Sequence, residues 1–264
     1  MMASHQTARP DPMVQTFLDQ QNEGLPPRLS ALPGQPIAPE MVLFRPSGND
    51  RAILPALAYH GLPACAPWTR HHALQALAER SGRLVFWNLA PDPSALSWVA
   101  RHGPAFGADP DRLAVAADGV AAIGLIHEIC ARRQPPALAA LLLATPVLGP
   151  AAPFAPQDAY LAQAHAAAVE QAEQRAAVHG WPLDLAQEQL RQLPPTLVLT
   201  AELDGFRDSA EGFARRLAAI DNDGAAMRCL GAIAHVTWLP PLLGAPVSLM
   251  AQQAMASFLQ DIAG

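Results

Sequence analysis

Apolar runs of strand length alternate with longer amphipathic stretches along most of this chain, and this alternation limits its fold more than any other feature. Strands are expected at residues 41–44, 53–59, 84–88, 113–117, 138–143, 196–201 and 226–230. Helices are expected at residues 70–80, 93–102, 120–132, 209–220 and 247–262. Strands joined through helices run parallel and are covered on both faces. The sequence therefore predicts an α/β fold with a mostly parallel central sheet between helices.

Two segments depart from this alternation. Residues 1–40 are rich in Pro, Gln and Gly around an apolar patch at Phe17 and Leu18, which predicts an N-terminal arm or short helix before a single domain at 41–264. A Gln-, Ala- and Glu-rich insertion at about 153–193 carries no strand signal. Ligands of open α/β sheets bind beyond the strand ends, so this insertion is either a lid or a helical excursion without a gating role.

Composition excludes several classes of partner. All 17 basic residues are Arg and the formal net charge is −6, which argues against binding to nucleic acid or to an anionic membrane. The polar N-terminus lacks a secretory signal, and the three cysteines have no metal-like spacing, so we expect reduced thiols in a cytoplasmic protein without metal or cofactor. The cysteines are Cys65, Cys130 and Cys229.

The segment 113–122 predicts a buried strand, a tight turn and a helix. This geometry, a nucleophile elbow, lifts the side chain at the apex of the turn above the edge of a sheet. The apex residue is Gly119, which has no side chain to lift. Glycine also tolerates the positive φ that an elbow imposes on its apex.

Several motifs resemble the hormone-sensitive-lipase-like branch of the α/β hydrolases, which includes bacterial acetyl esterases. Residues 88–91 read Asn-Leu-Ala-Pro, similar to Tyr-Arg-Leu-Ala-Pro, and 106–116 resemble the lead-in to the family's elbow. The segment 193–208 resembles the one that carries the catalytic Asp, which implies that role for Asp204, and His235 falls at the catalytic His. The elbow reads Ala-Asp-Gly-Val-Ala-Ala where the family has Gly-Asp-Ser-Ala-Gly-Gly, so the serine is replaced.

The resemblance also implies an oxyanion and substrate-binding site at Gly61, Leu62 and Val120. The family's His-Gly-Gly-Gly is represented by His-Gly-Leu-Pro at 60–63, and Pro63 has no backbone N–H to donate. The loss of one oxyanion donor typically slows catalysis about a hundred- to a thousand-fold. His-Gly-x-Pro also resembles the oxyanion loop of epoxide hydrolases, in which the third residue donates, so Leu62 could serve.

Three other residues could act as nucleophiles. Asp118 could attack if the turn slipped by one residue; otherwise it is a surface or helix-capping carboxylate. Cys65 follows the oxyanion loop and otherwise packs as a small apolar residue. Ser209 begins a predicted helix and is more simply a cap. For His235, the candidate base, the alternative is a structural histidine.

These features support three functional hypotheses. The first is a degenerate hydrolase, or pseudoenzyme, that binds a small acyl or apolar ligand, because a covalent mechanism needs an oxygen or sulfur nucleophile. The second is a non-covalent enzyme, a hydrolase, lyase or cyclase, in which Asp204 orients His235 as general base on a small molecule. The third is a structural or interaction protein. The resemblance allows a homodimer through the sheet edge or the last helix.

Overall fold

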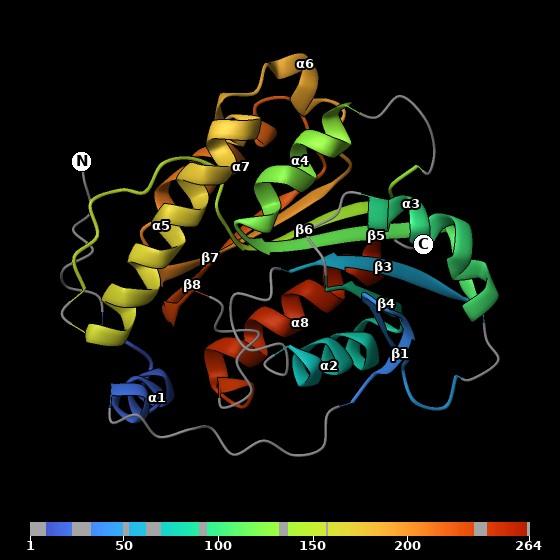
Figure 1. The fold of residues 1–264 in the computed structure, drawn as a ribbon, viewed down its shortest axis with the longest axis horizontal. Coiled ribbons are helices and arrows are strands. Elements are labelled where there is room, and N and C mark those ends of the chain that lie inside the picture. Colours follow the sequence, from blue (N-terminus) through green and yellow to red (C-terminus); the bar gives the residue numbers. More distant parts are fainter. Residues whose placement is uncertain are drawn as a thin grey trace.

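Within the described residues, eight strands form one sheet (Figure 1). The computed structural model describes residues 9–22, 33–49, 53–61, 70–89, 94–131, 137–156, 158–234 and 242–262. The strands are β1 (Gln35–Ala38), β2 (Met41–Phe44), β3 (Leu54–His60), β4 (Leu84–Asn88), β5 (Ala108–Gly119), β6 (Ala140–Pro146), β7 (Thr196–Leu203) and β8 (Ala225–Ile233). Their order is β1-β2-β4-β3-β5-β6-β7-β8, with only the β1–β2 and β2–β4 pairs antiparallel. The predicted mostly parallel sheet is confirmed.

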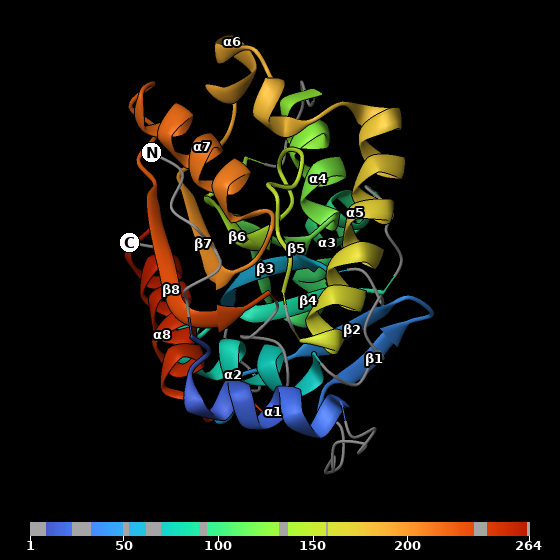
Figure 2. The same cartoon turned by 90° about the vertical axis from the view of Figure 1, so that its left-hand side faces the viewer.

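Helices cover both faces of this sheet (Figures 1 and 2). The α-helices are α1 (Pro12–Asn22), α2 (His71–Ser81), α3 (Ser94–His102), α4 (Ala121–Ala131), α5 (Ala159–His179), α6 (Gln187–Leu190), α7 (Arg207–Ala218) and α8 (Pro246–Asp261). Two 3-10 helices are η3 (Gly103–Phe106) and η4 (Pro182–Asp184). Buried residues of α1, α2 and α8 share one core cluster, and those of α3, α4 and α7 share the cluster on the other face.

The burial of β5 explains why the central strands read as continuous apolar runs. Ala114 and Ala116 pack in the cluster with α2 and α8, whereas Leu113, Val115 and Ala117 pack in the cluster with α4 and α7. Successive side chains of a strand point to opposite faces, so a strand covered on both faces needs apolar residues at every position. All seven predicted strands are present, with ends shifted by a few residues.

Strand β1 was not predicted, because it lies in the segment assigned to the N-terminal arm. Its four residues pair with β2 at the edge of the sheet, and the first two are exposed. An edge strand that buries little apolar surface leaves no alternating apolar pattern. The apolar patch at Phe17 and Leu18 does form a helix, α1, whose Val14 is also buried.

Arg83 is fully buried where the sheet meets α8. Its guanidinium donates to the carbonyl oxygens of Ala56 at 3.2 Å, Arg112 at 3.0 Å and Leu259 at 2.6 Å. Burial, followed by the charge of Arg112, lowers the pKa of Arg83 to about 10. One side chain therefore links β3, the β5 strand and α8 from inside the core.

We expect Arg83→Met to lower the free energy of unfolding by about 3–5 kcal/mol, because two buried carbonyl groups and one part-buried carbonyl group lose a charged donor. Urea denaturation followed by circular dichroism measures this loss. Arg101→Met, at an exposed position near the end of α3, is the matched control and should stay within about 0.5 kcal/mol of the native chain. Equal stability of the two variants would show that Arg83 contributes little.

Candidate functional site

The turn between β5 and α4 has the predicted strand–turn–helix geometry. Gly119 ends β5 with a φ of 52°, and α4 begins at Ala121. The backbone N–H of Val147 donates to the Gly119 carbonyl at 3.0 Å. A left-handed φ strains any residue with a Cβ, so glycine adopts this apex at little cost.

The neighbouring strand β6 carries a bulge at the same level. Asp118 pairs with Ala144 but Gly119 pairs with Pro146, so Thr145 falls between two registered pairs. Thr145 has a φ of 45°, which is unusual for a β-branched residue and costs about 1–3 kcal/mol. Bulges commonly re-aim side chains beside binding sites.

A cavity of about 410 Å³ lies above these two strand ends. Its floor includes Asp118, Gly119 and Thr145 at the carboxyl ends of β5 and β6, and residues of α5 form a wall. Most of the remaining lining is apolar, namely Val120, Val147, Phe154, Leu161, Ala164, Ala167, Ala168, Leu203, Phe206, Ile233 and Ala234. The rest is Arg70, Tyr160, Gln163, His165, Gln171, Asp204 and Gly205. The cavity therefore suits a small ligand with apolar parts.

The insertion supplies that wall, as its described residues fold into α5, η4 and α6. Ala172 of α5 packs with Val120 and Phe206 in a small apolar cluster over the turn. The Asp158 carboxylate caps α5 by accepting from the Leu161 N–H at 3.0 Å. Asn22 at the end of α1 donates to the same carboxylate at 2.6 Å, so the N-terminal helix holds the start of the wall.

Asp204 follows β7 and is buried in the cavity lining. Its carboxylate accepts from the Phe206 N–H at 3.0 Å, which fixes one oxygen. Gly119, Val120 and Asp204 thus line one cavity. The predicted positions His235, Leu62 and Cys65 lie outside the described residues.

Gly61 lies beside the same strand ends, directly after β3, although it does not line the cavity. A Cβ at this position would fall 2.6 Å from the Tyr59 hydroxyl oxygen. Glycine therefore allows the chain to pass close to the Tyr59 ring. The structure does not test the predicted oxyanion role of Gly61.

Asp118 forms a buried ion pair beneath Gly119. The Arg70 Nη2 atom donates to Asp118 Oδ2 at 2.6 Å, and Arg70 Nε lies 3.0 Å from the Tyr59 hydroxyl. Arg70 is 3% exposed and Asp118 is 1% exposed. Burial, followed by the charge of Asp118, raises the pKa of Tyr59 well above its usual value. Asp118 is thus neither a surface carboxylate nor a helix cap, and its charge is balanced by Arg70.

Ser209 is also placed differently from the prediction. It is the third residue of α7, and its hydroxyl donates to the Phe206 carbonyl at 2.8 Å. A cap would instead accept a bond from a free N–H at the helix start, so the assignment of Ser209 as a cap was wrong.

Cys130 and Cys229 are free and buried, and burial raises the pKa of each thiol to about 11.

Sequence reasoning missed six polar residues that line the cavity, namely Arg70, Thr145, Tyr160, Gln163, His165 and Gln171. Arg70 was expected within a helix, and it directly precedes α2. Thr145 lay beyond the predicted end of its strand. His165 lies in the Ala-rich α5, where no motif marks it.

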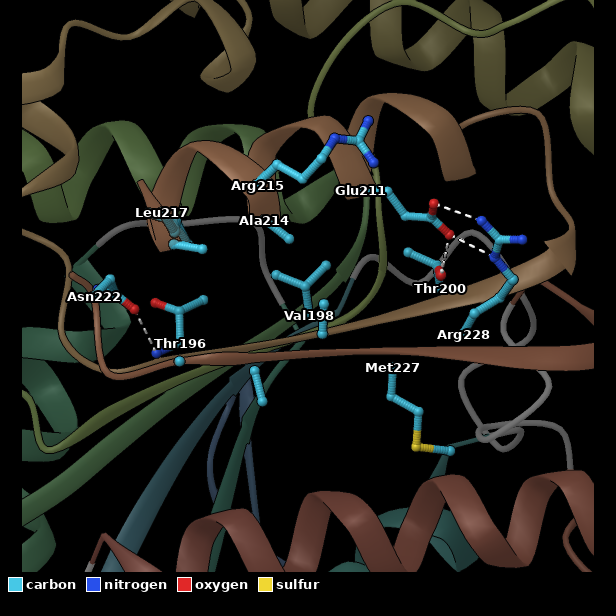
Figure 3. Close-up of a pocket in the computed structure, with 14 residues that line it drawn as sticks. Thr196, Val198, Thr200, Glu211, Ala214, Arg215, Leu217, Asn222, Met227 and Arg228 are labelled. Atoms are coloured by element: carbon cyan, nitrogen blue, oxygen red, sulfur yellow. Dashed lines mark hydrogen bonds and ion pairs between the residues drawn. The ribbon is translucent and has the colours of Figure 1, made fainter. Parts of the chain in front are cut away.

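A second cavity, of about 380 Å³, lies between α7 and the strands β7 and β8 (Figure 3). Its polar side includes Glu211, which accepts two bonds of 2.7 Å from Arg228 and one of 3.3 Å from Thr200. The Arg228 pair, mainly through hydrogen bonding, holds the pKa of Glu211 below its usual value. Neither Gly119 nor Asp204 lines this cavity, so we assign the candidate site to the first one.

Two kinds of feature are absent from the described residues. No group of three or more His, Cys, Asp or Glu side chains could hold a metal ion in that part of the chain. No helix there is both long and apolar enough to cross a bilayer.

Comparisons with known proteins agree with this architecture. Residues 93–238 match a family model described as alpha/beta hydrolase fold. A thermostable esterase from Pseudomonas putida ECU1011 is 24% identical, with a TM-score of 0.76 over 100% of this chain and 99% of that chain. Carboxyl esterase 2 from the fungus Tuber melanosporum is 21% identical, with a TM-score of 0.76 over 97% of this chain and 100% of that chain. Among curated protein sequences, none matches significantly.

The ion pair beneath Gly119 leads to a stability prediction. We expect Arg70→Met and Asp118→Leu each to lower the free energy of unfolding by about 3–5 kcal/mol, because each leaves a buried charge without its counter-ion. The double variant should lose less than the sum, with a coupling of about 2–3 kcal/mol. Urea denaturation of the four proteins measures this coupling, and additive losses would contradict it.

Proposed function

Because the chain belongs to the alpha/beta hydrolase fold family, matched over more than half of its length, we propose that it is a serine-less esterase relative that binds a small acyl or apolar ligand. The observation that carries this proposal is the glycine at the apex of the turn, inside a formed cavity. Acyl transfer through a covalent intermediate needs an oxygen or sulfur nucleophile at the apex. Gly119 has no such atom and contributes only backbone to the cavity lining.

The surroundings of Gly119 support the loss of covalent chemistry. Asp118, the adjacent carboxylate, is bonded to Arg70 at 2.6 Å. An attacking carboxylate would have to leave this pair, and breaking a buried pair is costly. The apolar lining and the volume of about 410 Å³ fit a small acyl group. The proposed partner is therefore a small molecule.

A second candidate function rests on Asp204. Its buried carboxylate lines the cavity at the end of β7, where the family resemblance places the acid that orients His235. In a non-covalent enzyme, His235 would remove a proton from water or from a substrate carbon, and such general base catalysis contributes about a hundred- to ten-thousand-fold. This candidate includes hydrolases, lyases and cyclases.

We expect Gly119→Ser to create esterase activity in a chain that lacks it. The rate of 4-nitrophenyl butyrate hydrolysis should rise at least about a hundredfold. The gain should be smaller than in an esterase with a complete oxyanion loop, because Pro63 has no backbone N–H to donate. The new side chain at a φ of 52° should cost about 1 kcal/mol of stability. Gly119→Ala carries the same Cβ without the hydroxyl and is the control. Equal rates for the two variants would contradict an otherwise intact esterase site.

A fluorophosphonate probe tests the absence of a nucleophile in the native chain. We expect intact-mass spectrometry to find no adduct on the native protein and one adduct on Gly119→Ser. An adduct on any cavity residue of the native chain would overturn the proposal of a serine-less binder.

The second candidate predicts a different pattern with His235→Ala. If the native chain turns over an ester or another small substrate, His235→Ala should lower kcat by about a hundred- to ten-thousand-fold. The pH profile of the native chain should then rise through the pKa of a histidine. Unchanged kcat in His235→Ala would exclude this mechanism.

A further inference from the structure

His165 reaches the cavity from α5 and is held between two aromatic rings. Its ring centroid lies 5.0 Å from that of Phe154, with the planes at 79°, and 5.7 Å from that of Phe206. All three residues line the cavity of about 410 Å³. Contacts from two different segments therefore define the position of the imidazole.

The backbone next to Asp204 is shaped around this ring. A Cβ at Gly205 would lie 2.3 Å from His165 Cε1 and 3.0 Å from each ring nitrogen. Only a residue without a side chain lets the imidazole approach so closely. The Ala152 N–H donates to the Gly205 carbonyl at 2.8 Å, which fixes this backbone from its other side.

The chemistry of this imidazole differs from that of the surrounding wall. Burial lowers the pKa of His165, so the ring is neutral at pH 7 and offers one N–H donor and one acceptor nitrogen. The other α5 residues that line the cavity are the apolar Leu161, Ala164, Ala167 and Ala168 and the uncharged polar Tyr160, Gln163 and Gln171, so His165 is the residue of this wall that can take up a proton. The charged groups of the same lining are Asp204 on the loop after β7 and the Arg70–Asp118 pair on the floor.

We propose that His165 determines ligand specificity by hydrogen bonding the carbonyl group of an acyl ligand from the α5 side of the cavity. This inference rests on the proposed function, because it assigns a polar contact within the same ligand site. A hydrogen-bonding group whose position is fixed by packing, as His165 is by Phe154, Phe206 and Gly205, selects ligands through their polar atoms, since a ligand without an acceptor leaves it unsatisfied.

Two probes of similar shape separate this role from mere packing. Butyranilide carries an amide carbonyl, whereas butylbenzene has no hydrogen-bonding atom. Isothermal titration calorimetry should show that His165→Phe weakens butyranilide binding about tenfold, the loss of one hydrogen bond, and leaves butylbenzene affinity unchanged. His165→Gln keeps a donor and an acceptor and should restore most of the butyranilide affinity.

His179→Phe is the matched control, because His179 lies on the same helix but outside the cavity lining. It should bind both probes as the native chain does, and thermal unfolding should show all three variants folded. An equal effect of His165→Phe on both probes, or no effect on either, would overturn the specificity role. If the native chain binds neither probe, the proposed ligand-binding function itself fails and the role of His165 falls with it.

A ligand that carries a carboxylate gives an independent test of the role of His165. Protonation of His165 on acidification should attract a carboxylate, so 4-phenylbutyrate should bind the native chain several-fold more tightly at pH 5.5 than at pH 7.5. A pH dependence that arises from the other charged groups of the lining, Asp204 and the Arg70–Asp118 pair, would persist in His165→Phe. Retention of the full pH dependence by that variant would overturn the assignment to His165.

Discussion

Hydrogen bonding of β5 to β3 on one side and to β6 on the other fixes the candidate site. Tyr59 and His60 pair with Ala116 and Ala117, so the end of β3 stops beside the apex of the β5–α4 turn. On the other side, the register shifts by one residue before Gly119. Because parallel strands end at the same edge of a sheet, this pairing places Gly61 after β3, Gly119 at the end of β5 and Thr145 near the end of β6 along one edge.

The cavity has two parts with different physical origins. Its floor consists of strand ends embedded in a two-sided core, and Arg70 and Asp118 neutralise one another within it. Its wall is the helix α5. Ala172 is the buried residue of this helix, and the other residues of α5 are half-buried or exposed. The floor therefore gains its rigidity from the sheet, whereas the wall depends on a few contacts that include His165 and the Asp158 cap.

The sequence predicted the parts that depend on local pattern. Buried strands such as β4 and β6 begin with runs of apolar residues, and the turn at Gly119 follows a similar apolar run at 113–117 of β5. The polar groups of the cavity could not be predicted in this way. Arg70 bonds to Asp118 across 48 positions of sequence, and His165 contacts Gly205 only because α5 lies against the loop that follows β7. Such pairings are products of tertiary packing, and no local periodicity records them.

The contact between Asn22 and Asp158 joins the end of α1 to the start of α5, two segments that lie 136 positions apart in the sequence. Asp158 caps α5, and the N–H of Tyr160 also donates to the Asn22 side chain at 3.1 Å. Release of α1 would therefore remove the acceptor of the Tyr160 N–H and one donor to the Asp158 carboxylate, and so weaken the start of the helix that carries His165. A ligand that ordered α5 would in this way also stabilise the N-terminal helix, a segment that does not line the cavity.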